Sequence, residues 1–280
     1  MDTASPARLD PDALAAAAAR EVWFHSIDLG HGVVTKGQKS PAALQKELAA
    51  LRLPDLAGKS VLDIGAYDGF YSFEAERRGA TRVVSLDLPA WQVETRLTDA
   101  YLAECAARGV EPAPPYRTEC MRWRLDPERM PGKARFDLAR RALASRVEPV
   151  VLDFMAARPA EIGTFDVVLF LGVLYHTENP LAAMRKLASL TRGVAVIETE
   201  AMEVPGAADV PLCEFFPGSE LNGDPSNWWS PNLRGLRGLV AAAGFTSCAV
   251  VQGPPPLGGL AAGDPPLRYR AMVHAFKPAG

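Results

Sequence analysis

Residues 61–70 read Val61-Leu62-Asp63-Ile64-Gly65-Ala66-Tyr67-Asp68-Gly69-Phe70. A short apolar run ends at an acid, passes through a turn that contains two glycines, and reaches a stretch of helical character. Glycine lets the backbone of such a turn approach a ligand closely. The stretch therefore predicts a strand, a turn and a helix start, which is the unit that opens a doubly wound α/β domain.

An alternation of strands and helices continues on both sides of this unit. Strands are expected at 60–64, 81–86, 147–152, 165–171, 193–198, 246–251 and 269–276, and helices at 13–20, 41–51, 70–78, 180–189 and 233–243. Nearly continuous apolar strands are typical of a parallel sheet that is covered on both faces. The last two strands are joined by a segment too rich in Pro and Gly for a crossover helix, so they should form an antiparallel hairpin. We predict an α/β, Rossmann-like, doubly wound seven-stranded sheet with its last strand antiparallel.

The remaining segments suggest how the chain is organised. Residues 1–52 are expected to form an N-terminal lid of helix and loop, and residues 53–280 the α/β domain. Two stretches, at about 91–146 and 201–232, are longer than a plain connection between neighbouring elements. Long excursions in a compact domain usually serve as lids or substrate walls, so we expect both insertions to border a ligand site.

Composition excludes several classes of protein. The 280 residues carry 30 Lys and Arg against 33 Asp and Glu, a formal net charge of -3, so no basic field for nucleic acid surrounds the whole molecule. No apolar run has the length of a membrane span, and the N-terminal residues lack the apolar core of a signal peptide. The four cysteines and four histidines show no metal-ligand spacing, so we expect no metal. These features favour a cytoplasmic protein with reduced thiols.

The acids beside the Gly65 turn indicate the kind of cofactor. A dinucleotide site needs G-x-G-x-x-G, but Tyr67 stands in place of the second glycine, and Asp63 and Asp68 would repel phosphates. S-adenosylmethionine carries an ammonium, a sulfonium, a ribose and no phosphate. Asp63 could hold its ammonium, and Asp87, which ends the next strand, could grip two ribose hydroxyls.

From Trp23 to Pro278 the chain resembles the class I S-adenosylmethionine-dependent methyltransferases. Within them it is similar to the branch of the bacterial tRNA wobble-uridine carboxymethyltransferase. The residues that carry the resemblance are Trp23–Asp28, Val61–Gly69, Leu171–His176, Ile197–Thr199 and Arg270–Pro278. The glycine-rich turn is shared by the superfamily, whereas the run Leu171-Gly172-Val173-Leu174-Tyr175-His176 and the N-terminal block are more specific to this branch.

The resemblance implies a set of cofactor-binding residues. They are Lys36, Asp63, Gly65, Tyr67, Gly69, Asp87, Leu88, Asp153, Phe154, Leu171, Tyr175 and Arg270. The tRNA enzymes of this branch use carboxy-S-adenosylmethionine, and the resemblance places the clamp for the extra carboxylate on Lys36, Tyr175 and Arg270. Alternatively Lys36 binds an acidic substrate, Tyr175 packs on the sulfonium, and Arg270 pairs with an acid on the neighbouring strand.

Catalytic and acceptor-binding groups are expected where ligands bind in such sheets. A general base is needed only when the acceptor is a hydroxyl or a protonated amine, and the candidates are His176, His25 and Glu200. Each also has a structural alternative, such as a packing role for His25. Trp228 and Trp229 are adjacent, so on an extended backbone one can line the acceptor pocket while the other faces the core. Asn232 completes the predicted acceptor site.

The sequence leaves the acceptor open between two classes. The most basic window, residues 117–146, interleaves arginines with aromatic residues, a pattern that can serve phosphate contacts and base stacking. The alternative, which we favour for this window, is an ordinary solvated helix face with packing aromatic residues. We favour methyl transfer to a small molecule, with methylation or carboxymethylation of the tRNA wobble uridine as the alternative and a non-catalytic, cofactor-binding subunit as a third reading.

Overall fold

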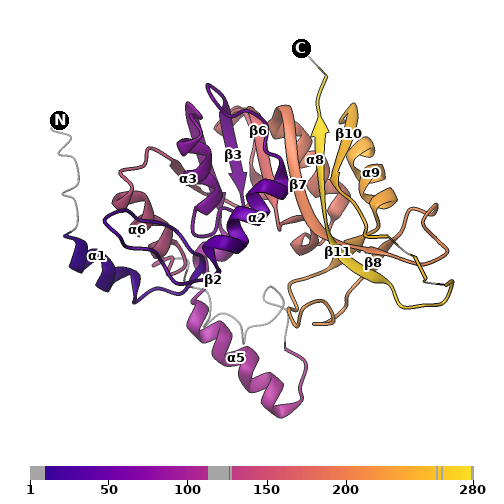
Figure 1. The fold of residues 1–280 in the computed structure, drawn as a ribbon, viewed down its shortest axis with the longest axis horizontal. Helices are drawn as coiled ribbons and strands as arrows, with labels where there is room; N and C mark the ends of the chain where they lie inside the picture. The colour runs from indigo at the N-terminus through magenta and orange to yellow at the C-terminus, as the bar shows by residue number, and fades with distance from the viewer. Residues whose placement is uncertain (1–9, 113–125, 127, 257, 260, 279–280) are drawn as a thin grey trace.

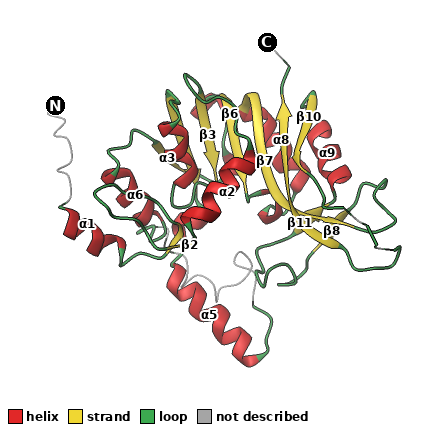
Figure 2. Cartoon of the chain, in the orientation of Figure 1, coloured by secondary structure: helices red, strands yellow, loops and turns green. Residues whose placement is uncertain are grey.

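In the computed structural model, the residues described are 10–112, 126, 128–256, 258–259 and 261–278. A seven-stranded sheet forms the centre of the molecule, with helices on both faces (Figure 2). The predicted fold class is confirmed. Cys120 and much of the basic window that precedes Asp126 lie outside the described residues.

The sheet has the order β10-β11-β7-β6-β3-β4-β5. Its strands are β3 (Ser60–Ile64), β4 (Arg82–Asp87), β5 (Glu148–Val151), β6 (Phe165–Leu171), β7 (Thr191–Glu203), β10 (Ser247–Gln252) and β11 (Leu267–Phe276). β3 to β7 are parallel, and β11 runs antiparallel to both β7 and β10. The expected hairpin therefore ends the sheet, with β11 inserted between β7 and the edge strand β10.

Two apolar layers hold the sheet between its helices. One contains residues of α8 (Pro180–Leu190) and α9 (Leu233–Ala242). The other contains residues of α1 (Pro11–Ala18), α2 (Pro41–Leu51), α3 (Phe70–Arg77) and α6 (Lys133–Ala142). The sequence encodes the starts of three of these helices, because Ser40, Asn179 and Asn232 accept hydrogen bonds from backbone N–H groups in the first turn.

The N-terminal stretch contains more regular structure than expected. Within residues 1–52, which were expected to contain only helix and loop, β1 (Trp23–His25) pairs in parallel with β2 (Gly37–Lys39). Trp23 is 2% exposed and lies in the same apolar layer as α3 and α6. The first 52 residues thus share their core with the sheet.

Both insertions contain elements that the sequence patterns did not separate. The first holds α4 (Pro89–Gln92), α5 (Thr95–Arg108) and α6, and the second holds β8 (Cys213–Phe215) paired with β9 (Trp229–Pro231). The strand expected to end at Glu198 continues to Glu203, because β11 pairs with β7 along its full length, from Phe276 opposite Val194 to Leu267 opposite Glu203. Other short elements are η2 (Phe154–Ala156), α7 (Pro159–Ile162) and η3 (Leu174–His176).

The carboxyl ends of the parallel strands point to the side of the molecule where β2, α5 and β8 lie (Figure 1). This is the edge at which ligands bind in open α/β sheets. No helix in the described part of the chain has the length and apolar character needed to cross a membrane.

Candidate functional site

The turn between β3 and α3 exposes its backbone at this edge of the sheet. Gly65, Tyr67 and Gly69 all have positive φ, of 73°, 53° and 90°. The Gly65 amide donates to the carbonyl of Leu86 at 2.8 Å. A Cβ on Gly65 would lie 2.8 Å from Cγ2 of Val173, so no side chain fits there. The turn is therefore a cradle of bare backbone, as a closely bound ligand requires.

Asp87 lies beside this cradle, at the end of β4. Its Oδ2 accepts from the backbone amide of Tyr67 at 2.9 Å and its Oδ1 from that of Ala90 at 3.1 Å. Burial raises the pKa of Asp87 to about 6, although the two amides act in the opposite direction. Each carboxylate oxygen keeps capacity for a further donor, so the group can accept a pair of hydroxyls.

Asp63, at the start of the same turn, already has a partner within the fold. It is 3% exposed, and its Oδ2 accepts from the hydroxyl of Ser72 at 2.6 Å. Burial raises the pKa of Asp63 to about 7, against the effect of the Ser72 hydrogen bond and with a contribution from the charge of Asp87. Its predicted contact with an ammonium group stays a prediction.

We expect these buried acids to make the stability of the ligand-free protein fall as pH rises. Both folded-state pKa values lie above the ordinary value of 3.8, so the folded state holds protons that the unfolded state releases. The stabilisation is complete below about pH 4 and is lost between there and pH 7. Asp63→Asn, which removes the charge but keeps an acceptor for Ser72, should be more stable than wild type at pH 8 by at least ~1 kcal/mol and lose this advantage at pH 4.5. Thermal unfolding at the two pH values measures the difference, and an advantage independent of pH would contradict the assignment.

Four other predicted cofactor residues occupy the neighbouring strand ends. Leu88 and Leu171 are partly buried directly after β4 and at the end of β6. Asp153 is exposed and accepts from the amide of Met155 at 2.8 Å, which caps η2. The ring of Phe154 is 8% exposed and packs on Phe170, so it belongs to the core.

The N-terminal segment is anchored to the turn by Asp68, which is fully buried. Its Oδ2 accepts from the backbone amides of Phe24 and His25 at 3.1 and 2.8 Å, and its Oδ1 lies 2.5 Å from Nδ1 of His25. The His25 ring is itself 5% exposed and stacks on Phe70. This geometry matches the packing alternative for His25, because its polar contact holds the segment in place.

Asp68→Ala should loosen residues 23–39. The change leaves the buried amide of His25 and the partly buried amide of Phe24 without their acceptor, at a cost of about 2 kcal/mol. We expect a lower melting temperature and faster proteolytic cleavage before β3. Asp55→Ala is the matched control, since Asp55 is exposed and accepts only from the nearby Ala57 amide. Equal cleavage rates for the two variants would contradict the anchoring role.

Arg270 forms an ionic cluster where β11 pairs with β7. Its Nη2 lies 2.5 Å from Oε2 of Glu198, its Nε also binds Glu198, and its Nη1 lies 2.8 Å from Oε1 of Glu200. The guanidinium stacks over the ring of Tyr175, with Nη2 3.5 Å from the hydroxyl. Of the readings left open for Arg270, the structure thus contains the pair with acids on the neighbouring strand. Glu200 thus pairs with Arg270, and its Oε1 also accepts a hydrogen bond from the side-chain amide of Asn222 at 3.1 Å.

Lys36 is exposed on the loop that leads into β2. Among the described residues it forms no hydrogen bond or ion pair with Tyr175 or Arg270. The structure therefore brings Tyr175 and Arg270 together and does not join Lys36 to them.

His176 ends η3, directly after β6 and the Gly172 turn. Its Nδ1 lies 3.0 Å from the hydroxyl and 3.1 Å from the carbonyl oxygen of Ser226, which belongs to the second insertion. Asp224 in turn accepts from the hydroxyl and the amide of Ser226 at 2.7 and 2.8 Å. The backbone amide of Trp228 donates to the carbonyl of Tyr175 at 2.7 Å, so this insertion is firmly docked on η3.

The three residues predicted to bind the acceptor differ in burial and in their contacts. Trp228 is 2% exposed and packs in the interior, whereas Trp229 is partly exposed and donates to the carbonyl of Glu178 at 3.1 Å. Both rings lie near Phe215, with centroid distances of 6.4 Å for Trp228 and 4.9 Å for Trp229, and the predicted pocket-lining role stays a prediction. Asn232 is fully buried and caps α9, and its side chain also bonds Leu212 and Val210. Its amide is thus used inside the protein, and the predicted substrate contact of Asn232 stays a prediction.

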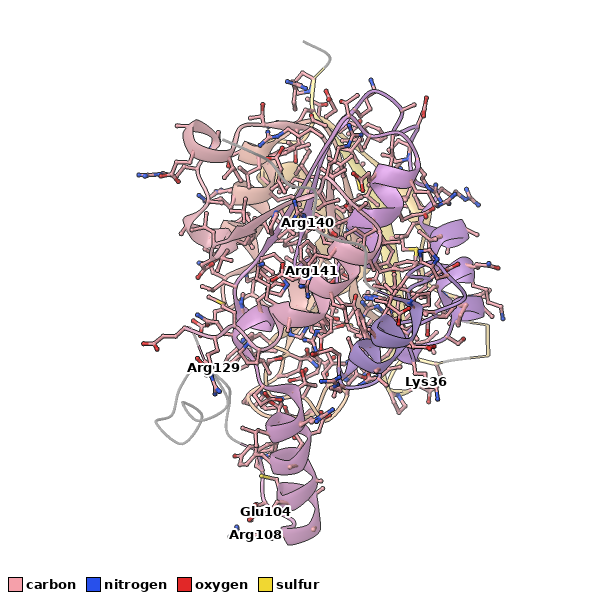
Figure 3. The ribbon with its side chains drawn as sticks, turned by 90° about the vertical axis from the view of Figure 1, so that its left-hand side faces the viewer. Lys36, Glu104, Arg108, Arg129, Arg140 and Arg141 are labelled. Carbon is pink, nitrogen blue, oxygen red and sulfur yellow. The ribbon has the colours of Figure 1, made fainter. Side chains whose placement is uncertain are left out.

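The basic residues of the first insertion are largely paired where the structure describes them. Arg129 pairs with Asp126, and Lys133 with Asp137 at 2.6 Å. Arg140 donates to the carbonyl of Val147 at 2.6 Å. Figure 3 shows Arg140 and Arg141 on α6 near the middle of the view, away from the end of α5 that carries Glu104 and Arg108 at the bottom. Lys36 lies toward the right of the same view. Of the aromatic residues near this window, Tyr116 and Trp123 lie outside the described residues, and Phe136 is buried against Phe73 and Trp91, where it cannot stack a base.

Sequence reasoning missed the partners that come from distant segments. Glu198 as the main partner of Arg270, Asp68 as the partner of His25, and the pair Ser226 and Asp224 were not singled out as a connected set. Only the strand register and the docking of the second insertion reveal them. Among the described residues, no group of three or more His, Cys, Asp or Glu could hold a metal ion.

Comparisons with known proteins show which family and which folds this chain is similar to. A family model described as a methyltransferase domain matches residues 37–249. A tRNA U34 carboxymethyltransferase of Pseudomonas savastanoi pv. phaseolicola is 26% identical over 198 residues, which cover 70% of this chain and 48% of that protein. One from Idiomarina loihiensis is 25% identical over 202 residues, with 72% and 50% covered. The chain thus spans about half the length of the curated relatives it matches.

A solved structure shares the whole fold. The N-terminal domain of EvdMO1, determined in the presence of SAH and D-fucose, aligns with a TM-score of 0.61 and 15% identity over 96% of this chain and 98% of that domain. The complete EvdMO1 aligns with a TM-score of 0.56 over 99% of this chain and 50% of that protein. The similarity confirms the predicted architecture.

Proposed function

The chain belongs to the methyltransferase domain family, and from this premise we propose that it transfers a methyl group from S-adenosylmethionine to a small-molecule acceptor. The observation that carries the proposal is the carboxylate of Asp87 beside the bare backbone of Gly65. One face of a ligand can lie against the turn while its hydroxyls reach the acid.

The residues present fit S-adenosylmethionine. Asp87 would accept the two ribose hydroxyls, and Leu88, Asp153 and the backbone of Phe154 would border the adenine. When bound, the cofactor supplies an electrophilic methyl group on a sulfonium. The protein's part is to align that methyl group with the acceptor and to exclude water. Tyr175 would contribute its ring to the cofactor site. The guanidinium of Arg270 packs on this ring and is held in place by Glu198 and Glu200.

The same cluster argues for the ordinary donor over the carboxylated one. Arg270 carries one positive charge, and Glu198 and Glu200 together carry two negative charges in direct contact with it. A third carboxylate beside this group would meet net negative charge at close range. It could enter only if one of the two acids left Arg270 or took up a proton.

A small acceptor is favoured by the second insertion and by the state of the basic residues. Residues 226–229 dock on η3 and bring Ser226 against His176, so this segment borders the edge of the sheet beside the proposed base. Of the described basic residues of the first insertion, Arg129 and Lys133 pair with acids, which reduces the positive charge that could contact phosphates. Arg140 is held by the carbonyl of Val147 and keeps its charge.

Two measurements test the proposal. Calorimetry with S-adenosylmethionine and S-adenosylhomocysteine should show one site per chain. Release of S-adenosylhomocysteine is then followed with a panel of small hydroxyl, amine and thiol compounds, D-fucose among them, and with bulk tRNA. Absence of cofactor binding would refute the proposal as a whole, and turnover with tRNA alone would refute the small-molecule acceptor.

The names of the curated relatives favour a second function, carboxymethylation of tRNA with a carboxylated donor. Tyr175 and Arg270 lie together as that function requires. Native mass spectrometry of the purified protein, followed by denaturing analysis of the bound compound, distinguishes the donors by mass. Co-purified carboxy-S-adenosylmethionine, with affinity lost selectively in Lys36→Ala, would establish the second function.

A further inference from the structure

His176 at the end of η3 contacts Ser226 of the second insertion, and this contact determines which nitrogen of the His176 ring carries the proton. The carbonyl oxygen of Ser226 can only accept a hydrogen bond, and it lies 3.1 Å from Nδ1 of His176. The hydroxyl of Ser226 lies 2.7 Å from Oδ1 of Asp224, so its proton is directed to that carboxylate. The hydroxyl therefore presents a lone pair to Nδ1, 3.0 Å away.

Both partners of Nδ1 thus require it to carry a proton. The opposite tautomer would set an unprotonated Nδ1 against the carbonyl oxygen, two acceptors at hydrogen-bond distance with no proton between them. It would also take the Ser226 hydroxyl proton from Asp224. The arrangement that satisfies every group places the proton on Nδ1 and the lone pair of the neutral ring on Nε2.

Nε2 forms no hydrogen bond with any residue that the structure describes, although the ring is only partly exposed. The Tyr175 ring lies beside it, with centroids 4.3 Å apart. The charged groups that act on the ring are Asp224, Glu200 and Arg270. Burial lowers the pKa of His176, with Arg270 adding to this and the two acids opposing it, so the ring is neutral at pH 7.

We propose that Asp224 and Ser226 are positioning residues that hold His176 in the Nδ1–H tautomer, so that Nε2 acts as the general base for an acceptor hydroxyl. This inference rests on the proposed function and narrows its acceptor to an alcohol or a phenol. As the acceptor oxygen forms its bond to the methyl carbon, the carbon–sulfur bond breaks and its electron pair stays on sulfur. The hydroxyl proton moves to Nε2, and Asp224 offsets the charge of the imidazolium through Ser226.

Nitrogen-15 NMR of the histidine side chains tests the tautomer without an acceptor. His176→Gln identifies the signals of His176 among those of His25, His31 and His274. We expect a protonated Nδ1, an unprotonated Nε2 and titration below the ordinary value of 6.5. Asp224→Asn keeps an acceptor for Ser226 but removes the charge, and it should lower the pKa further. A proton on Nε2 at pH 7, or an unchanged pKa in Asp224→Asn, overturns the proposal.

Turnover tests the acceptor class, with D-fucose and catechol as hydroxyl probes and their amino analogues as controls. We expect S-adenosylhomocysteine release with a hydroxyl probe, a loss of kcat of roughly 10²–10⁴-fold in His176→Gln with unchanged cofactor affinity, and a smaller loss in Ser226→Ala that Ser226→Thr restores. Release confined to amines, or none with the hydroxyl probes, refutes this inference. If wild type binds no S-adenosylmethionine at all, the proposed function itself has failed.

Discussion

Asp87→Ala is expected to weaken S-adenosylmethionine binding by about 100-fold or more. The variant removes the acceptor for two ribose hydroxyls, and each charge-assisted hydrogen bond of this kind contributes roughly 1.5–3 kcal/mol. It also releases the backbone amides of Tyr67 and Ala90, which Asp87 now holds at 2.9 and 3.1 Å. The turn that forms the cradle would then lose its support from β4.

Two variants separate these effects. Asp87→Asn keeps an acceptor for the Tyr67 amide but presents an amide to the ribose, so its affinity should fall between those of wild type and Asp87→Ala. Asp55→Asn is the matched control, because Asp55 is an exposed acid with no assigned place in the cofactor site and, among the described residues, bonds only its local Ala57 amide. Calorimetry should find a change of at most a few-fold there. Equal affinity of Asp87→Ala and wild type would remove the ribose assignment.

The fold could be predicted because its signals are local. The strand 60–64 and the strand 165–171 were expected at their observed bounds, since each is a dense apolar run closed by a glycine turn. The helix over 41–51 was also expected at its observed bounds, and its start is encoded locally, because the Ser40 hydroxyl accepts from the Ala43 amide at 3.3 Å and Pro41 is the first helical residue. These features are decided within a few residues of sequence.

The site could be predicted only in part, because its chemistry depends on register. Arg270 lies opposite Glu200 in the β11–β7 pairing, a relation that no spacing within either strand reveals. Likewise His25 meets Asp68 only through the docking of the N-terminal segment, and His176 meets Ser226 only through the fold of an insertion. The sequence therefore offers candidate residues, whereas their partners are revealed only by the fold.

Arg270→Ala should reduce the free energy of unfolding by about 3 kcal/mol at pH 8. The side chains of Glu198 and Glu200 are only 12% and 13% exposed, and without the guanidinium their like charges would face each other with no counterion. For a chain of this size the loss corresponds to a fall in melting temperature of roughly 5–10 °C.

A charge-neutral triple variant distinguishes this electrostatic cause from lost packing. Arg270→Met combined with Glu198→Gln and Glu200→Gln removes all three charges, so it should recover most of the stability. Arg192→Met is the matched control, since Arg192 is 59% exposed in its pair with Asp166 and should cost below ~1 kcal/mol. If Arg270→Ala were as stable as Arg192→Met at pH 8, the two acids would not depend on Arg270. The guanidinium of Arg270 would then be free to bind a donor carboxylate, and this result would favour carboxy-S-adenosylmethionine over S-adenosylmethionine as the donor.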